Sequence, residues 1–272
     1  MRKLSIAAIS AIAVLAFSGV AYAANLYGLP IASTAPKGVG SPTKPVPTGV
    51  KFGYTVKDTN GPRGAPVKTY KIAFQGLTTK YAKNFPTCKF SDTAPDAPLA
   101  TIDAKCKKAK LGTGRIESLV TTDALAGDPT SVLFYCNLQL TLYNLGYGMA
   151  IRLDADNTPQ PTSQDGPIGC IVNTHRAIEA KFKNVKIGGV ASSSLNFDVP
   201  EDLRHNSGLS ITVGNTESTI KKKSTKVKIK GKKRAVGVYS SIGCGKGKKR
   251  EVRVTFVDEN GVSSNSSKKV GC

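Results

Sequence analysis

The chain has 272 residues and a mass of 28.6 kDa, and its 39 Lys and Arg residues against 18 Asp and Glu residues give a formal net charge of +21. Apolar residues make up 40% and charged residues 21%, and no run of 18 apolar residues follows the first 23 positions. These values argue against intrinsic disorder and against an integral membrane protein. With only two His, two Met and six Cys, no metal or other cofactor is predicted.

The first 23 residues have the pattern of an export signal. Met1-Arg2-Lys3 is a short basic segment, positions 4–17 are mostly apolar, and Ala21-Tyr22-Ala23 places small residues before a cleavage site at Ala24. The apolar part is too short to span a bilayer as a helix, which needs about 20 residues. The sequence therefore predicts a secreted or extracytoplasmic protein associated with the cell envelope.

A Pro- and Gly-rich N-terminal arm is predicted over residues 24–49, because positions 35–49 hold four Pro and three Gly. The remaining residues, 50–272, are interpreted as one β domain whose basic C-terminal strands begin at about residue 221.

From Val50 onward apolar side chains recur with a period of two, which is typical of strands. A long hairpin is expected over 132–154, with its reversal at residues 144–148. The run Ser118 to Leu125 is the one segment that resembles a short helix. Further strands are expected around residues 52–56, 70–74, 178–182, 185–190, 195–199, 209–213, 226–230, 235–240 and 251–257.

Many short strands separated by turn residues predict an all-β fold, an antiparallel β-sandwich with a β-barrel as the alternative. Six cysteines behind an export signal predict three disulfides that staple this fold. Six cysteines allow fifteen connectivities, and we expect nearest neighbours along the chain to pair because each such pair flanks one loop or hairpin. The expected pairs are Cys88 with Cys106, Cys136 with Cys170, and Cys244 with Cys272.

Several short motifs resemble exported β-rich proteins of unknown function from actinobacteria. They are Phe85-Pro86-Thr87-Cys88, the segment after Cys106 that ends in Gly112-Thr113-Gly114, residues 197–203, and the C-terminal module between Cys244 and Cys272. The resemblance spans roughly residues 50–272, although Lys107-Lys108 departs from the Pro and small residues usual after the second cysteine. It implies an extracytoplasmic β protein with Cys88–Cys106 and Cys244–Cys272 disulfides, and it transfers no catalytic residue.

The candidate catalytic and metal-binding residues are sparse. His175 and His205 lack the Gly-x-Ser-x-Gly elbow of a Ser/His/Asp hydrolase and are interpreted as surface or turn residues. Asp154, Asp156, Asn157 and Asp165 could supply calcium ligands but lack the spacing of a dedicated loop. Gly112-Thr113-Gly114 is half of a phosphate loop and is interpreted as a β-turn.

Charge is the most informative feature of the sequence. Residues 221–272 hold 16 Lys and Arg against 3 acidic residues, and the alternation with apolar side chains places the basic residues on outward strand faces. We expect one positive sheet face that contacts anionic polymers or membrane headgroups. It would bind no specific nucleic acid, because stacking aromatics are nearly absent there. The candidate contact residues are Lys226, Lys228, Lys230, Lys249, Arg250 and Arg253.

The sequence thus favours a non-enzymatic binding or structural protein. The same basic residues also serve solubility, because Lys-rich strands discourage strand-to-strand aggregation. One alternative is a carrier of an apolar ligand in a β cavity. A second is a wall or polysaccharide hydrolase, for which Asp198 with Glu201 or Asp202 is the only dense acidic cluster.

The mature chain is expected to begin within two residues of Ala24. Intact-mass measurement of the exported protein checks this boundary. An extracellular species that retains Met1 would contradict it.

Overall fold

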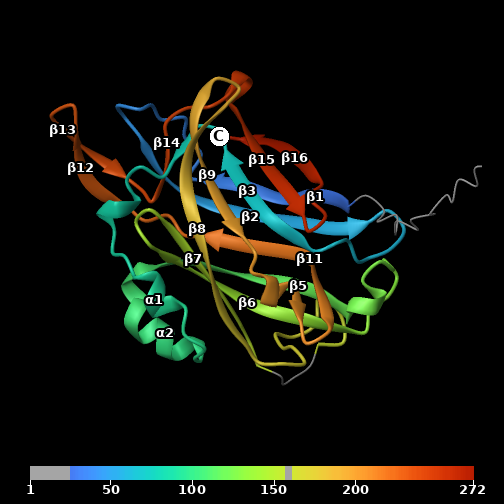
Figure 1. Cartoon of the computed structure of the whole chain (residues 1–272). Helices are drawn as coiled ribbons and strands as arrows, with labels where there is room; N and C mark the ends of the chain where they lie inside the picture. The colour runs from blue at the N-terminus through green and yellow to red at the C-terminus, as the bar shows by residue number, and fades with distance from the viewer. Residues whose placement is uncertain (1–24, 157–160) are drawn as a thin grey trace, which may run out of the picture.

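The computed structural model describes residues 25–156 and 161–272. The expected signal peptide and Asn157 lie outside these ranges. The described chain is mostly β, and one antiparallel sheet curls strongly into a half-barrel (Figure 1). The expectation of a two-sheet sandwich is wrong, because the apolar faces belong to a single continuous ladder of strands, closer to the barrel alternative.

Twelve strands follow one another through this sheet in the order β16-β15-β3-β9-β8-β7-β6-β5-β11-β2-β14-β4, with β1 added to β2 and β10 to β11. A separate two-stranded sheet is formed by β12 and β13. The strands are β1 (Asn25–Ala35), β2 (Val46–Asp58), β3 (Val67–Phe74), β4 (Leu77–Thr78), β5 (Lys110–Thr122), β6 (Phe134–Asn144), β7 (Gly148–Ala155), β8 (Thr174–Ile187), β9 (Val190–Asp198), β10 (His205–Asn206), β11 (Leu209–Ile220), β12 (Thr225–Ile229), β13 (Lys232–Val236), β14 (Tyr239–Ser241), β15 (Lys249–Asp258) and β16 (Ser263–Gly271).

The expected hairpin over 132–154 is confirmed as β6 and β7, and most other expected strands are present. Two expectations are wrong. Residues 178–182 and 185–190 are not two separate strands: β8 runs through to Ile187 and β9 begins at Val190, on either side of a turn at Gly188 and Gly189. The run 118–125 is not helical, since it completes β5 and ends in a 3₁₀ turn, η3 (Asp123–Leu125).

The segment predicted as a trailing arm lies against the body of the protein. Residues 25–35 form β1, which pairs antiparallel with β2 from Asn25 opposite Asp58 to Ala35 opposite Gly49. The outer edge of β1 meets β16, where the Ser266 hydroxyl donates to the Tyr27 carbonyl and Lys268 Nζ donates to the Pro30 carbonyl. The two ends of the curled sheet therefore touch through side chains rather than through a strand ladder.

Bulges and close strand contacts accompany the curl. The register shifts between Val213 and Asn215 in β11 and between Lys110 and Gly112 in β5, and such bulges bend a strand and increase its twist. A Cβ atom at Gly112 would lie 2.0 Å from the Thr219 carbonyl oxygen, and one at Gly114 would lie 2.1 Å from that of Glu217. Gly112-Thr113-Gly114 is therefore a glycine-dependent part of β5 and not the predicted turn.

The concave face of the sheet carries the main core. Aromatic side chains from β1, β2, β3 and β15 stack across one half of it: Tyr27 lies 4.1 Å from Phe256, and Tyr54 lies 5.3 Å from Tyr70, between ring centroids. Aliphatic side chains of β6, β7 and β8 line the other half. Tyr and Phe bury large areas in such clusters, so this aromatic set holds the two ends of the sheet together.

Two short helices cover the convex side of β6 and β7 at one end: α1 (Phe90–Thr93) and α2 (Leu99–Cys106). Ile102 and Cys106 of α2 pack on Tyr143, Leu145 and Ala150 as a second, smaller core. The Tyr143 hydroxyl donates to Asp103 at 2.5 Å. Burial, with this hydrogen bond, raises the pKa of Tyr143, so the phenol stays neutral. No helix in the described ranges is long and apolar enough to cross a membrane.

All three expected disulfides are present, and the described chain has no free cysteine. Cys88–Cys106 closes the helical segment, Cys136–Cys170 ties β6 to the segment before β8, and Cys244–Cys272 ties the end of β16 to the loop before β15. Stable disulfides of this kind indicate an oxidising, extracytoplasmic compartment.

Three fully buried arginines hold loops onto the sheet by donating to backbone carbonyls. Arg63 donates to carbonyls of the 125–131 loop, Arg152 to those of Thr93, Pro95 and Ala97, and Arg250 to that of Gln75. Arg152 also pairs with Asp154 at 2.9 Å. The α1–α2 segment is thereby fixed to β7 by one buried guanidinium.

Replacing Arg152 with Met should destabilise the fold by about 3–5 kcal/mol, because buried Asp154 would lose its guanidinium partner and the carbonyls of Thr93, Pro95 and Ala97 would lose their donor. Urea unfolding measures the change. Arg253→Met is the matched control, since Arg253 pairs with Glu251 at the surface and should cost under about 1 kcal/mol. Equal midpoints for the two variants would contradict a clamping role for Arg152.

Candidate functional site

The β12–β13 hairpin is the most basic element of the described chain. Lys228 lies directly opposite Lys233 in the ladder, and Lys226 shares their face, while Val227 and Arg234 face the other way. The reversal is a two-residue turn at Lys230 and Gly231, which both have positive φ. Within the described ranges, no ion pair involves a Lys of this hairpin. We call residues 225–236 the basic hairpin.

The predicted single positive face does not exist, because the candidate residues lie on two different elements. Lys226, Lys228 and Lys230 are exposed on the basic hairpin, whereas Lys249 and Arg253 lie on the outward face of β15. The prediction that Arg250 is an outward contact residue is wrong. Its side chain is 0% exposed, donates to Gln75 and Ser241, and has its pKa lowered to about 10 by burial.

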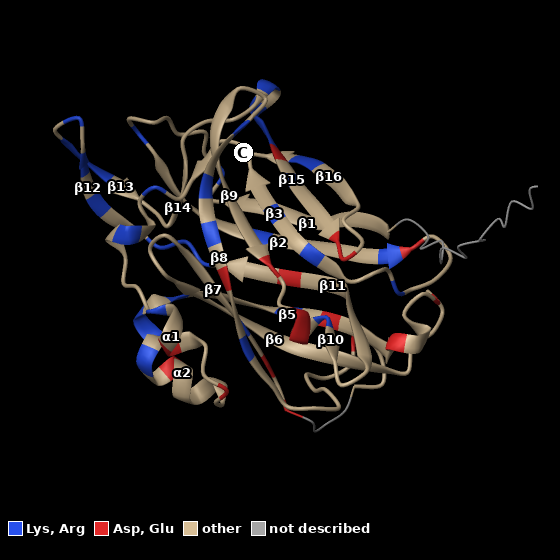
Figure 2. Ribbon diagram, viewed as in Figure 1, with Lys and Arg blue, Asp and Glu red and all other residues tan. Residues whose placement is uncertain are grey.

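The basic hairpin projects from one side of the molecule (Figure 2). Its base is anchored to another basic segment, since Lys223 Nζ donates to the carbonyl of Lys108 in the 3₁₀ turn η2 (Lys107–Ala109). Acidic segments gather elsewhere in this view, around β10 and the adjoining 3₁₀ turn η4 (Glu201–Leu203). The basic hairpin therefore lies apart from these acidic segments.

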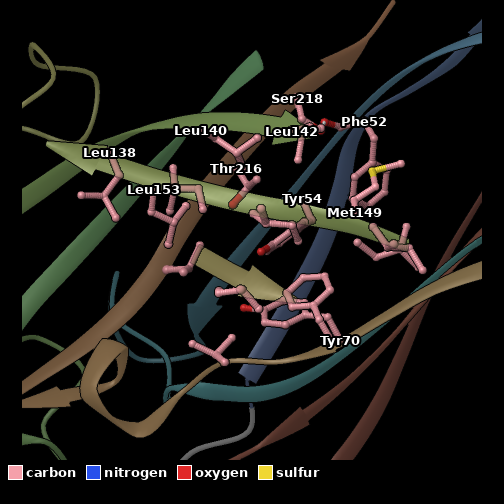
Figure 3. A pocket seen from close by; sticks show the side chains of 18 of the residues that line it. Phe52, Tyr54, Tyr70, Leu138, Leu140, Leu142, Met149, Leu153, Thr216 and Ser218 are labelled. Carbon is pink, nitrogen blue, oxygen red and sulfur yellow. Dashed lines mark hydrogen bonds between the residues drawn. The ribbon is translucent and has the colours of Figure 1, made fainter. Parts of the chain in front are cut away.

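Inside the half-barrel lies an apolar cavity of about 110 Å³, which we call the lumen. Figure 3 shows Leu138, Leu140 and Leu142 facing it, opposite Tyr54 and Tyr70. Met149, Ile151 and Leu153 of β7 complete its aliphatic wall. Burial raises the pKa of both Tyr54 and Tyr70, so the hydroxyls that reach the lumen are uncharged.

A second cavity of about 120 Å³ adjoins the lumen and opens at the end of the sheet near β10; we call it the mouth. Leu138, Leu203 and Ile211 line both cavities. The rim includes Ile171 and Val172, whose side chains are 42% and 46% exposed. The Cys136–Cys170 disulfide forms part of the wall.

The charged side chains at the mouth are held by one another. Arg176 lies 3.3 Å from Asp202 and 3.5 Å from Asp96, and all three are substantially exposed. His175 Nδ1 lies 3.1 Å from Asp154, and its Nε2 lies 3.7 Å from Asp156. His175 is thus neither a free surface residue nor paired with a serine in the contacts of the described chain.

The other candidate acids are held by hydrogen bonds or ion pairs with neighbouring side chains. Asp198 accepts a hydrogen bond from Thr69, Asp202 is bound to Arg176, and Asp165 accepts from Ser163. Asp154 is committed to Arg152 and His175. No group of three His, Cys, Asp or Glu that could hold a metal is found among the described residues.

Sequence reasoning raised a β cavity only as an alternative and named none of the residues that line the lumen or the mouth. The alternating apolar residues of β6 and β7 were identified as strand faces, but periodicity does not tell a filled core from a cavity. The exposed pair Ile171-Val172, directly after Cys170, was the available signal.

Comparisons with models of known protein families, with curated proteins and with solved structures find no match for this chain. The resemblance to exported actinobacterial proteins stays a prediction.

His205 joins three segments near the mouth. Its Nδ1 lies 2.8 Å from Asp123 after β5, and its Nε2 lies 2.6 Å from Glu259 in the β15–β16 turn. Partial burial lowers the pKa of His205, but the hydrogen bonds to Glu259 and Asp123 raise it more, so the pKa lies above its ordinary value. The protonated ring therefore stabilises the fold.

This stabilisation should be complete below about pH 6.5, the ordinary pKa of histidine, and should be lost as pH rises through the raised pKa. The urea midpoint of His205→Gln should consequently fall further below that of the parent at pH 5.5 than at pH 9. The neighbouring exposed Asn206→Ala should give a difference that does not depend on pH. A constant difference for His205→Gln would show that the ring acts only by packing.

Proposed function

We propose that the protein is a non-enzymatic binder of anionic polymers of the cell envelope, and that the basic hairpin makes the contact. The observation that carries this proposal is the placement of Lys228 directly opposite Lys233 on an exposed, projecting two-stranded sheet. Like charges directly opposite each other destabilise a strand pair, and an isolated two-stranded hairpin is marginal in water. A bound polyanion would relieve this repulsion.

The surrounding sequence does not relieve it. From residue 218 to residue 250 the chain has no Asp or Glu, and nine Lys and Arg residues fall between positions 221 and 234. Exposed cations clustered on one element raise the local concentration of anionic partners and speed their association. The remaining exposed lysines are divided among other strands, helices and turns, and the hairpin holds the densest run of them in the sequence.

The side-chain chemistry favours a repetitive polymer over a specific sequence. Lysine ammonium groups act as point charges, without the planar fork by which arginine recognises one phosphate or carboxylate. Residues two apart in a strand are separated by about 7 Å, so the lysines form a regular row. Tyr239, the one aromatic residue between positions 221 and 250, is buried in β14. Base-specific recognition of single-stranded nucleic acid therefore has no support.

Replacing Lys226, Lys228 and Lys233 with Gln should lower the salt concentration needed to elute the protein from immobilised teichoic acid or heparin. In titrations at several salt concentrations, the slope of log K against log salt should fall by about three, one for each lost phosphate contact. Thermal stability should change little, because these side chains are exposed.

The matched control is the triple replacement of Lys57, Lys68 and Lys71 with Gln, three exposed lysines on β2 and β3 that change the net charge by the same amount. The control should keep the parental slope. Equal losses in both triple variants would mean that net charge alone attracts the polymer. A parent that is not retained at 50 mM salt would leave solubility as the role of the hairpin.

A further inference from the structure

The lumen and the mouth adjoin each other inside the half-barrel. Leu138, Leu203 and Ile211 line both, so these side chains lie where the two cavities meet. We propose that the two cavities join into one apolar path that binds a small apolar molecule, uncharged or cationic, which enters at the mouth. The site is independent of the basic hairpin.

The two volumes set the size of the ligand. A dry apolar cavity of about 150 Å³ accepts benzene, which has six heavy atoms. By that comparison the lumen, at about 110 Å³, holds four or five carbons, and the mouth, at about 120 Å³, holds about as many. An alkyl chain of about eight carbons, or one aromatic ring with a short substituent, matches the path. A long acyl chain does not.

The composition of the path orients such a ligand. The inner end is lined by Leu, Ile, Met and aromatic side chains, whereas polar groups are concentrated around the outer end, where His175, Asn206 and Ser207 line the mouth. Ile171 and Val172 extend the apolar lining to the rim and are exposed there. An apolar chain would lie inward, with its polar end among the side chains of the mouth.

The charges at the mouth select the polar end. Asp96 and Asp202 line it and pair with Arg176, and Asp156 lies 3.7 Å from His175, which also lines it, so three carboxylates and one arginine lie in or beside the mouth. Arg176 is already bound to two of these carboxylates. The ionised headgroup of a fatty acid would meet net negative charge there, although the protein as a whole is strongly basic. A hydroxyl or ammonium headgroup avoids this repulsion.

Met149 provides a single reporter for the test. The chain has two methionines, and Met149 is fully buried on the wall of the lumen, while Met1 belongs to the expected leader. In the mature protein labelled with [methyl-¹³C]methionine, octylamine and 1-octanol should each shift the Met149 resonance in a saturable way at pH 7. Octanoate should bind at least several-fold more weakly than either.

Two variants separate binding from folding. Leu138→Phe fills the junction of lumen and mouth and should weaken octanol binding at least tenfold, whereas Leu119→Phe, at a buried position outside the path, should leave it unchanged in folded protein. Asp96→Asn with Asp202→Asn changes only exposed side chains and frees Arg176. This double variant should tighten octanoate binding and leave octanol binding unchanged.

Absence of any shift at Met149 with all three ligands, in parent protein that gives a folded spectrum, would overturn the proposal. So would saturable shifts that Leu138→Phe, also folded, leaves intact. Tighter binding of octanoate than of octylamine to the parent would overturn the charge selection. Failure here would leave polymer binding at the basic hairpin untouched, because none of these residues belongs to it.

Discussion

A single sheet with one apolar face has to bury that face against itself, and the rest of this structure depends on that constraint. In β6 and β7 nearly every second residue is a large aliphatic side chain, which forces these strands to face an apolar partner. No second sheet supplies it in the described chain. The apolar partner is the aromatic cluster of β2, β3 and β15, which the curl of the sheet places opposite β6 and β7. Where the two sides meet they pack closely, and where they diverge the lumen remains.

The curl leaves long loops at the ends of the sheet, and buried arginines hold them. Arg63, Arg152 and Arg250 each donate to backbone carbonyls that loops would otherwise leave without a partner. Carbonyl oxygens can accept from a guanidinium without bringing a second charge into the core. The chain has more than twice as many basic as acidic residues, so this choice of acceptor suits its composition. Arg152 also pairs with a buried carboxylate, Asp154, which in turn contacts His175 at the mouth.

Period-two alternation and cysteine spacing predicted the β6–β7 hairpin and all three disulfides, because both signals are local. Bulges defeat the same reasoning. In β11 the inward residues are Ile211 and Val213 before the register shift, and Thr216, Ser218 and Ile220 after it. If the period-two pattern were continued unbroken from Val213, it would place Asn215 and Glu217 inward instead of Thr216 and Ser218. At Arg250 the alternation of β15 was the correct guide, because it places this residue inward. The prediction went wrong there because the charge of the residue suggested an outward role.

Isolation of the basic hairpin from the large sheet explains how one small fold can carry two unrelated sites. The hairpin pairs only with itself, so its lysines contribute no hydrogen-bonded strand to the half-barrel. A polymer bound there would contact only this peripheral hairpin and would not disturb the curl of the sheet, the aromatic cluster or the lumen. Strand β10, which contributes Asn206 to the lining of the mouth, lies away from the hairpin in Figure 2. A protein held by its lysines at an anionic surface would therefore keep its mouth free, and surface anions would have no electrostatic reason to enter it.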